Sequence, residues 1–580
     1  GNVDIDGTLE TDNLTIGGAQ GSDGQVLTST GSGVAWENAG SGGSGATFKE
    51  EGTNFTNSLM VGDDATGTLN AATGNTALGI DVFAALTSGD NNVAVGFGAL
   101  KANTTAQSNT AVGAGAMEGC TTGEYNTAVG NIAMDAANMT GNFNTAVGRN
   151  AMGGNTSGSS NCAIGINAMQ SNTTGTLNCS MGDSALYSNT SGTENSTIGY
   201  VAGRALTTGN YNTALGSNAL VHNTTSDENT AIGRSALHQL TTGAKNTSIG
   251  YRSGHDLTTG TSNVCIGAEA GTAMTTTTGN IAIGQDALKV VTTADYNVAV
   301  GYQAGIALTS AIGVVLMGYQ AGDAITTGDT NICIGGFSMD GGAGKTAYGC
   351  THVGHAGQRT GTSGIMNSSF GIDAYKDPTT GAYNTCLGGG SGKLITTGQT
   401  NTVVGYVAGA NVTTGSNNVC IGYVSGNVNH TPGGGISTVS NRIILGNTAS
   451  THALIQIDWT VASDKRDKTD VTPLDMGLSF INKLEPVTYK WDKRVKYEEG
   501  KTPDGTHKES WTDVGFLAQD VEKIEAEFGH KIEDETNLTT YMSEDKDAYG
   551  LTYAKFVPML VKSVQELSTQ VDELKSELLA

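Results

Sequence analysis

A short pattern of polar and apolar residues repeats every seventeen residues from about residue 75 to about residue 446. Each repeat holds an Asn, two further residues, an apolar residue and a Gly, as in segments 109–113, 126–130 and 212–216. The closing glycines stay almost seventeen residues apart from Gly79 to Gly335. Such a period is typical of solenoids, whose rungs bury a core only by stacking on their neighbours. We therefore predict a mainly β fold, a parallel β-solenoid or β-roll of about 21 rungs.

The columns of the repeat predict how one rung is built. The residue before the closing glycine is apolar from rung to rung, as at Val112, Val129 and Ile283, which predicts an interior ridge. Ala or Ser stands three residues after the glycine in most rungs, where we expect only a small side chain to fit. The repeated Asn predicts a ladder of amides, each bonding its own turn and the next rung. Thr-Thr-Gly turns with a positive-φ glycine then leave two short parallel strands per rung.

Tyrosine follows the closing glycine in six rungs, and in those rungs the column that elsewhere holds Leu or Met holds Gly. The pairs are Tyr200 with Gly203, Tyr251 with Gly254, Tyr302 with Gly305, Tyr319 with Gly322, Tyr406 with Gly409 and Tyr423 with Gly426. One interpretation is that the ring fills the missing volume, because well-packed interiors tolerate volume-preserving exchanges best. The alternative is an exposed row of rings on which sugars stack.

Composition and charge exclude several classes of function. The chain has 85 Gly and 6 Pro, which suits tight repeated turns, and only 14% charged residues. Its net charge of −25 opposes binding to a phosphate backbone, so we expect no nucleic-acid partner. No run of eighteen apolar residues occurs, so we expect no membrane insertion. The eight cysteines lack metal or disulfide spacings, and six are interpreted as small core residues: Cys162, Cys179, Cys265, Cys333, Cys386 and Cys420.

Two irregular insertions interrupt the repeat, near residues 336–371 and 423–445. The first carries Cys350, His352, His355 and Arg359, which form either a metal-binding cluster or a plain surface loop. Because the cluster lacks a fourth ligand and a familiar spacing, we expect no metal and no cofactor. The second insertion is either a contact surface or a cap that closes the solenoid.

The chain divides into three predicted domains. Residues 1–73 form a β-rich stem with a Gly/Ser-rich joint, residues 74–449 form the solenoid shaft, and residues 450–580 differ sharply in composition. Apolar residues in the last segment are spaced alternately four and three apart, which predicts an oligomerising coiled-coil helix. They are Leu560, Val564, Leu567, Val571, Leu574 and Leu578.

The solenoid repeat and four C-terminal segments carry resemblances to known families. The solenoid repeat resembles the head repeats of trimeric autotransporter adhesins and the repeats of many phage tail fibres, although the adhesin repeat is shorter. The segment 463–468, Ser-Asp-Lys-Arg-Asp-Lys, resembles the Ser-Asp-x-Arg-x-Lys signature of the self-cleaving intramolecular chaperones that end phage endosialidases, tail fibres and neck appendages. A family of membrane-bound transcription factors shares that domain. The segments 484–491, 514–521 and 553–567 agree with it in order.

The resemblance implies an α+β chaperone domain over residues 450–580 and a single-turnover serine peptidase within it. Ser463 would attack the carbonyl of Ala462, Lys468 would act as general base, and the chain would part between Ala462 and Ser463. Asp464 and Arg466 would shape the site, paired with each other or with a neighbouring chain. Without the three other segments, the short charged segment 463–468 would be interpreted as an exposed turn.

The same resemblance implies a homotrimeric viral tail fibre or appendage for host-cell attachment. Its expected partners are a host-cell surface glycan or protein receptor and, at the N-terminus, other virion tail proteins. The expected location is the virion, with the chaperone fragment released in the host cytoplasm during assembly. The alternatives are a bacterial trimeric surface adhesin and a glycan-degrading tailspike. The latter needs paired carboxylates, and few acidic residues recur at fixed solenoid positions, so no enzymatic activity is expected of the shaft.

Overall fold

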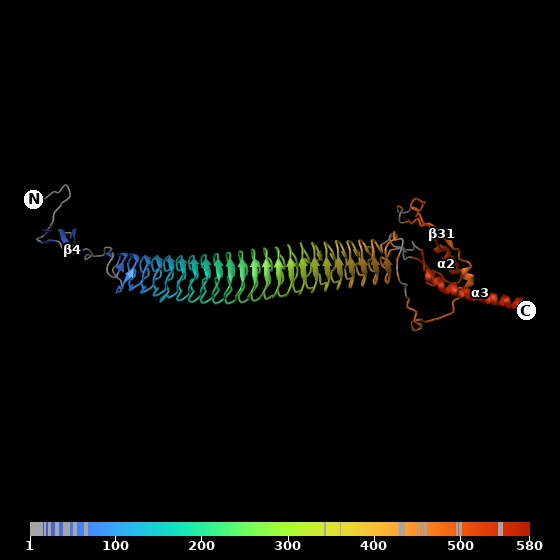
Figure 1. Ribbon diagram of the computed structural model, residues 1–580, viewed down its shortest axis with the longest axis horizontal. Helices are drawn as coiled ribbons and strands as arrows, with labels where there is room; N and C mark the ends of the chain where they lie inside the picture. Colours follow the sequence, from blue (N-terminus) through green and yellow to red (C-terminus); the bar gives the residue numbers. More distant parts are fainter. Residues whose placement is uncertain are drawn as a thin grey trace. The chain divides into compact units, whose positions relative to one another are not determined.

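The computed structural model describes residues 15–16, 19–20, 25–29, 34–38, 47–49, 55–62, 68–341, 344–359, 361–427, 435–450, 453–454, 456, 461–494, 497, 502–542 and 549–579. It divides into two compact units, residues 1–280 and 281–580. Both contain the stacked rungs of a parallel β-solenoid, which has about 21 turns of about seventeen residues in all (Figure 1). Small sheets and a terminal helix follow in the second unit, so the predicted fold class is confirmed.

Short paired strands come before the regular rungs. β1 (Thr15–Ile16) pairs antiparallel with β2 (Ala19–Gln20), β3 (Gln25–Ser29) with β4 (Val34–Asn38), and β5 (Thr47–Lys49) with β7 (Leu59–Gly62). β6 (Phe55–Thr56) pairs parallel with β8 (Ala72–Thr73). These strands fall within residues 1–73, the predicted stem, but β7 also pairs parallel and in register with β9 (Thr76–Gly79), so the ladder already begins at residue 59. The Gly/Ser-rich joint at 40–45 lies outside the described residues.

Each regular rung adds one short strand to a parallel ladder. In the first unit these are β9 (Thr76–Gly79), β10 (Val93–Val95), β11 (Thr110–Val112), β12 (Thr127–Val129), β13 (Thr145–Val147), β14 (Cys162–Ile164), β15 (Cys179–Met181), β16 (Ser196–Ile198), β17 (Thr213–Leu215), β18 (Thr230–Ile232), β19 (Thr247–Ile249) and β20 (Val264–Ile266). In the second unit they are β21 (Ile281–Ile283), β22 (Val298–Val300), β23 (Val315–Met317), β24 (Ile332–Ile334), β25 (Thr351–Val353), β26 (Ser368–Phe370), β27 (Thr385–Leu387), β28 (Thr402–Val404), β29 (Val419–Ile421) and β30 (Ile443–Leu445).

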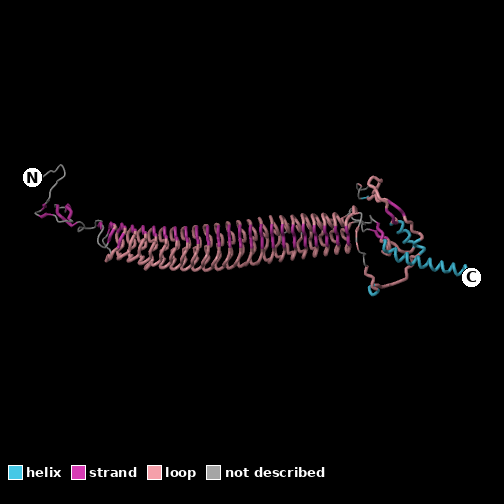
Figure 2. The backbone as a smooth tube through the Cα atoms, in the orientation of Figure 1, coloured by secondary structure: helices cyan, strands magenta, loops and turns pink. Residues whose placement is uncertain are grey.

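The prediction of two strands per rung was wrong. Turns and bends fill the rest of each rung, and Figure 2 shows the strands of each unit in one row with loops completing every turn. The backbone explains this difference, because residues after the closing glycine enter the left-handed region. Leu100 and Met117, for example, have φ of 51° and 52°, and such residues cannot continue an extended strand.

The alternation along each strand decides which side chains enter the core. In β11, Ala111 is fully buried, Thr110 is half-buried and Val112 is 36% exposed. The column before the closing glycine therefore lies on the outer face of the sheet, and the predicted interior ridge was wrong. A three-residue strand turns only its middle side chain inward. That residue packs with the Ala column and the Leu or Met column, represented by the buried Ala116 and Met117.

The tyrosines that follow the closing glycine also face outward, so the interpretation that their rings fill the core was wrong. Their exposed fractions run from 39% at Tyr302 to 63% at Tyr423. The volume above each glycine is taken instead by a larger residue in the middle of a strand. A Cβ added at Gly409 would lie 2.5 Å from Val403 Cγ1, and one added at Gly203 would lie 2.8 Å from Thr197 Cγ2.

The predicted asparagine ladder is confirmed. The backbone N–H of Asn109 donates to Oδ1 of Asn92 at 3.0 Å, and Nδ2 of Asn109 donates to the Gly123 carbonyl at 2.9 Å. A second buried ladder, which sequence reasoning missed, links Asn155 to Asn172 at 2.9 Å through their side chains. Both ladders satisfy buried backbone groups at the turns, as buried polar groups require.

Two kinds of glycine meet different requirements. Gly113, a closing glycine, has φ of 137°, and an added Cβ would lie 2.4 Å from the Gly130 carbonyl oxygen. Gly209, in a Thr-Thr-Gly turn, lies outside the positive-φ region, so that prediction was wrong. Close approach demands glycine there, because a Cβ would lie 2.3 Å from the Ser226 oxygen.

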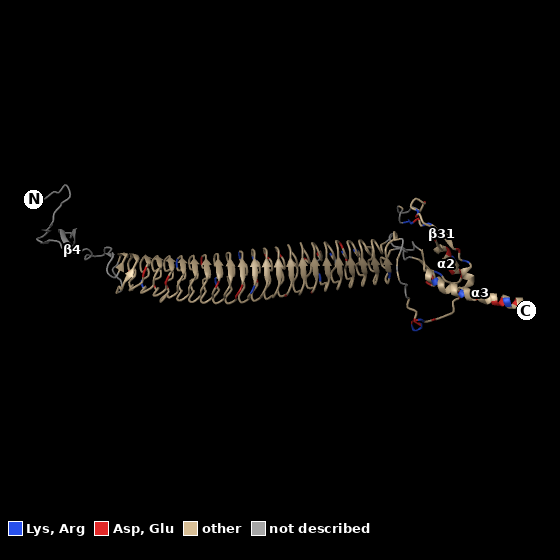
Figure 3. Ribbon diagram, viewed as in Figure 1, with Lys and Arg blue, Asp and Glu red and all other residues tan. Residues whose placement is uncertain are grey.

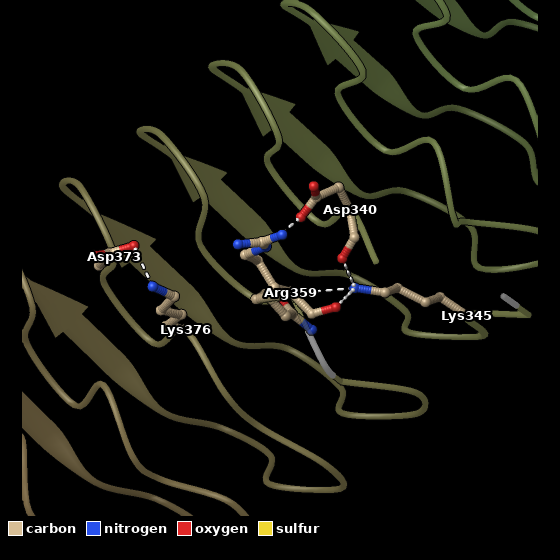
Figure 4. A network of polar contacts seen from close by, with 6 residues as sticks. Asp340, Lys345, Arg359, Asp373 and Lys376 are labelled. Carbon is tan, nitrogen blue, oxygen red and sulfur yellow. Dashed lines mark hydrogen bonds and ion pairs between the residues drawn. The ribbon is translucent and has the colours of Figure 1, made fainter. Parts of the chain in front are cut away.

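The first insertion forms a rung rather than the predicted surface loop, because β25 pairs with β24 before it and β26 after it. Lys345 is buried beside this rung and donates to the carbonyls of Asp340, Gln358 and Arg359 at 2.8, 2.6 and 2.7 Å (Figure 4). Nε of Arg359 also pairs with the Asp340 carboxylate at 3.0 Å. Burial lowers the pKa of Lys345 to about 8.

The residues of the proposed metal cluster take separate roles in this rung. Cys350 is buried, its Sγ 3.4 Å from the Gly364 carbonyl, and the buried His352 bonds Ser369 through Nδ1. His355 is exposed, with its ring 5.5 Å from Phe337. Within the described residues, no group of three or more His, Cys, Asp or Glu side chains is placed to hold a metal ion.

The second insertion leaves the ladder unbroken, because β29 still pairs in register with β30. Residues 428–434, the middle of this insertion, lie outside the described residues. All eight cysteines are free. Four of the six assigned to the core are buried there (Cys265, Cys333, Cys386 and Cys420), whereas Cys162 and Cys179 are half-buried on the outer face of their strands, contrary to prediction.

Candidate active site

The C-terminal region packs three helices and two small sheets around its own core. In order, its main elements are α1 (Leu478–Ile481), β31 (Val487–Tyr489), β32 (Asp513–Gly515), α2 (Ala518–Glu527), β33 (Thr540–Met542), β34 (Tyr549–Leu551), the 3-10 helix η3 (Tyr553–Lys555) and α3 (Phe556–Leu579). β31 pairs antiparallel with β32, and β33 with β34. Five buried side chains, Met476, Phe480, Val521, Phe556 and Met559, form the centre of this core.

Two carboxylates fasten this region at positions that hydrophobic patterning does not mark. Glu566 of α3 accepts a hydrogen bond from the Leu478 backbone N–H at 2.7 Å, at the start of α1. The buried Glu525 of α2 accepts from the backbone and hydroxyl groups of Thr539 and Thr540. A buried carboxylate needs such partners, because its desolvation is otherwise costly.

The predicted catalytic pair flanks a short helical turn, η1 (Lys465–Asp467). Ser463 precedes this turn and Lys468 follows it, and Nζ of Lys468 donates a hydrogen bond to Oγ of Ser463 at 2.6 Å. The turn therefore folds the chain back so that residues five apart in sequence meet. This separation is within the reach expected of a nucleophile and its base.

Asp464 and Arg466 hold this turn in place. Asp464 caps it, since its Oδ1 accepts from the Arg466 backbone N–H at 2.9 Å. The Arg466 guanidinium also grips the same carboxylate, with Nη2 2.6 Å from Oδ2. Hydrogen bonding by the Arg466 side chain lowers the pKa of Asp464, and the carboxylate in turn raises the pKa of Arg466. Within one chain, the two residues pair with each other, in agreement with one of the two predicted arrangements.

Every residue from Ala462 to Lys468 is exposed in the single chain. A lysine must be neutral to accept a proton from a serine, and dry surroundings favour the neutral form. Ser463 and Lys468 are thus in contact, and within the described part of the single chain both stay open to solvent.

A comparison with family models finds a similarity within this region. Residues 463–530 match the chaperone of endosialidase family. The match begins at Ser463 and covers three of the four segments that carried the resemblance, leaving segment 553–567 beyond it. Comparisons with curated proteins and with solved structures give no match.

The endosialidase chaperone family is a self-cleaving intramolecular chaperone, so this domain supports a role in folding or assembling a trimeric fibre. A β-solenoid followed by this chaperone domain is the architecture of tail fibres that carry an endosialidase-type chaperone.

The terminal helix of the chaperone domain leaves its heptad seam uncovered. Leu560, Val564, Leu567 and Val571 are 40% to 65% exposed, whereas Phe556 and Met559 at the start of α3 pack into the core. Among the described residues, no helix combines the length and apolarity that a bilayer span requires.

Proposed function

We propose that this chain is a tail-fibre or appendage protein whose chaperone domain gathers three copies, registers their solenoids and then cuts itself off between Ala462 and Ser463. The observation that carries the proposal is the 2.6 Å contact between Lys468 Nζ and Ser463 Oγ, at the first residue of the family match.

In the proposed cleavage, Lys468 acts first as a base and then as an acid. Oγ of Ser463 adds to the carbonyl carbon of Ala462 while neutral Lys468 takes the hydroxyl proton. The peptide C–N bond then breaks, the nitrogen of Ser463 leaves as an amine carrying a proton returned by Lys468, and Ala462 is held as an ester. Water hydrolyses this ester to give a carboxylate at Ala462 and to restore the serine hydroxyl. Water is the only co-reactant that these two steps consume.

The exposed dyad supports a cleavage that waits for assembly. Lys468 becomes a base only when it is desolvated, and a neighbouring chain laid over the turn at 463–468 would exclude that water. The uncovered seam of α3 supplies apolar surface for gathering chains. Cleavage after registration also suits the fibre, because loss of the nucleating module removes the easy route back to separate chains.

Host attachment is the proposed role of the finished fibre, with a surface glycan or protein of the host cell as receptor. The support is the fibre architecture together with the loops that complete each rung of the solenoid. The proposed place of the fibre is the virion, with the cleaved chaperone left in the cytoplasm of the infected cell.

Intact-mass analysis of the expressed chain tests the cleavage. Wild-type protein should yield a large fragment ending at Ala462 and a small one starting at Ser463, whereas Ser463→Ala and Lys468→Ala should both stay intact. Lys465→Ala is the matched control, because it removes an exposed lysine of the same turn and should leave cleavage unchanged.

The dependence of cleavage on assembly is tested by its kinetics. The initial rate per chain should rise with chain concentration, since the neighbouring copies complete the site. Cleavage of Ser463→Ala at the same bond, or a wild-type rate per chain that does not depend on concentration, would contradict the proposal.

A further inference from the structure

One face of the solenoid turns four positions of every rung outward. Around β12, Ala128 is fully buried, and Val129 is 37% exposed. Tyr125, just before the ladder asparagine, is 49% exposed, and Asn131, just after the closing glycine, is also exposed. We call the first of these flanking positions the entry border and the second the exit border.

Large apolar side chains recur at the third strand position in rung after rung and at the borders of many rungs, whereas the first strand position holds Thr, Ser or Cys in most rungs of the first unit. Exposed examples are Met181 and Ile198 in the third strand position, Tyr211 at the entry border and Tyr200 at the exit border, with exposed fractions from 38% to 59%. We call the whole face, strand positions one and three with both borders, the apolar strip. Monomeric soluble proteins rarely expose contiguous apolar surface on this scale.

The middle of the apolar strip also lacks charge. Among the described strands, none from β9 to β30 contains Asp, Glu, Lys or Arg, and Figure 3 shows the strand row uncoloured by charge within each unit. Lysines and acidic residues are the usual means by which exposed β surfaces resist association. Their absence here leaves a surface built to be covered.

The repeat identifies what covers it. A partner that fits the strip over many rungs must present apolar groups at the same rung-to-rung spacing, and another copy of this chain laid parallel does so at every level. A carbohydrate would need only a local cluster of rings, whereas the apolar third strand position recurs through both units. The exposed seam of α3 shows that the chain carries a second surface suited to self-association.

In one rung, the charges at the two borders favour a specific arrangement. Glu228 lies at the entry border and Arg234 at the exit border of the same rung, and both are exposed. When parallel copies surround a common axis, the entry border of one faces the exit border of the next, so Glu228 meets Arg234. Antiparallel copies would instead place entry borders opposite each other at different levels, without this match.

We infer that the apolar strip is the surface on which copies of this chain pack, parallel and in register around a common axis, with entry borders against exit borders. This inference rests on the proposed assembly and adds the face, the direction and the register of the contact.

Disulfide trapping in the full-length chain tests the arrangement. The background carries Cys162→Ser and Cys179→Ser, because these two cysteines lie half-buried on the same outer face. In this background, Glu228→Cys together with Arg234→Cys should give covalent trimers under mild oxidation, seen on a non-reducing denaturing gel. Each single cysteine variant, and the background alone, should run at the mass of one chain.

A second rung repeats the test in case the first pair disturbs folding. Lys245 and Tyr251 occupy the entry and exit borders of the next rung and are both exposed, so Lys245→Cys with Tyr251→Cys should trap the same species. The oligomeric mass of each variant is measured before oxidation by native mass spectrometry.

The possible failures are distinct. Trimers that form but are not trapped by either pair would leave the strip open to solvent, as a carbohydrate-binding surface requires, and would overturn the inference while the assembly stands. Dimers trapped by the single variants would indicate entry-to-entry or exit-to-exit contacts and would also overturn it. A monomeric wild-type chain would instead overturn the proposed assembly itself.

Discussion

The side chain of Val403 occupies the core volume that a side chain at position 409 would need. Moving the large side chain from one position to the other tests how the core is packed. Val403 is fully buried in the middle of β28, and a Cβ built on Gly409 would lie 2.5 Å from its Cγ1. In other rungs this pair of positions holds Ala and Leu, as at Ala231 and Leu237, with Leu237 at φ of 48°. The backbone therefore accepts a leucine, and only the valine side chain prevents it.

The expected losses of stability follow from the side-chain volumes that each substitution removes or adds. Val403→Ala removes the equivalent of two methylene groups from a sealed core and should cost about 2 kcal/mol. Gly409→Leu forces a side chain into occupied space and should cost about 1–3 kcal/mol. The double variant recreates the Ala and Leu combination and should recover most of both losses, a coupling of about 2–3 kcal/mol.

The assay is native-state hydrogen exchange by mass spectrometry on peptides that cover residues 402–412, which gives the free energy of local opening. All variants are compared in the same oligomeric state. Tyr406→Ala is the matched control: Tyr406 is 61% exposed, so its removal should not rescue Gly409→Leu. Rescue by Tyr406→Ala, without rescue by Val403→Ala, would refute the packing described here.

Three further outcomes are expected. Asn229→Ala should lower the local opening free energy by about 2–5 kcal/mol, because it strands buried backbone groups of the next rung, whereas the exposed Asn131→Ala should change it by under about 0.5 kcal/mol in the same exchange assay. Burial lowers the pKa of His352 to about 4 from an ordinary 6.5, so the unfolded chain binds more protons between these values. Exchange at its rung should therefore show stability falling by up to about 3 kcal/mol as pH drops through that window, and His352→Ser should remove the effect. Asp464→Ala removes the cap of the turn between Ser463 and Lys468 and should slow the proposed cleavage several-fold, without the complete loss expected of Lys468→Ala, in a gel time course.

The sequence predicted the rung and its asparagine ladder because both depend on local, repeated chemistry. It did not predict which apolar column faces inward. Ala111 and Val112 are both apolar, and a strand of three residues is too short for its alternation to show which side is dry. Because the core is narrow, the smaller Ala111 faces inward, although hydrophobicity alone would favour Val112.

Some residues of the C-terminal region could be predicted from the sequence and others could not. Ser463 and Lys468 could be named from the sequence because a resemblance marked them, and the turn that joins them follows from the cap at Asp464. The carboxylate contacts of Glu525 and Glu566 could not be named, since they join positions 14 and 88 residues apart and follow no short motif. Such pairs become visible only when the helices are placed in space.

One short strand in each rung gives the shaft freedom in sequence length. In the ladder, the backbone N–H of one rung usually donates to an Asn side chain 17 residues earlier. The spacing is 19 residues where Cys350 donates to Asn331 and 24 where Arg442 donates to Asn418, yet the strands still pair residue for residue. The strands keep their register across these longer spacings, and lengthening a loop costs little entropy. The solenoid can therefore diversify by grafting: foreign peptides inserted in these two longer spacings should leave the pairing of the strands unchanged, and whole rungs can be gained or lost.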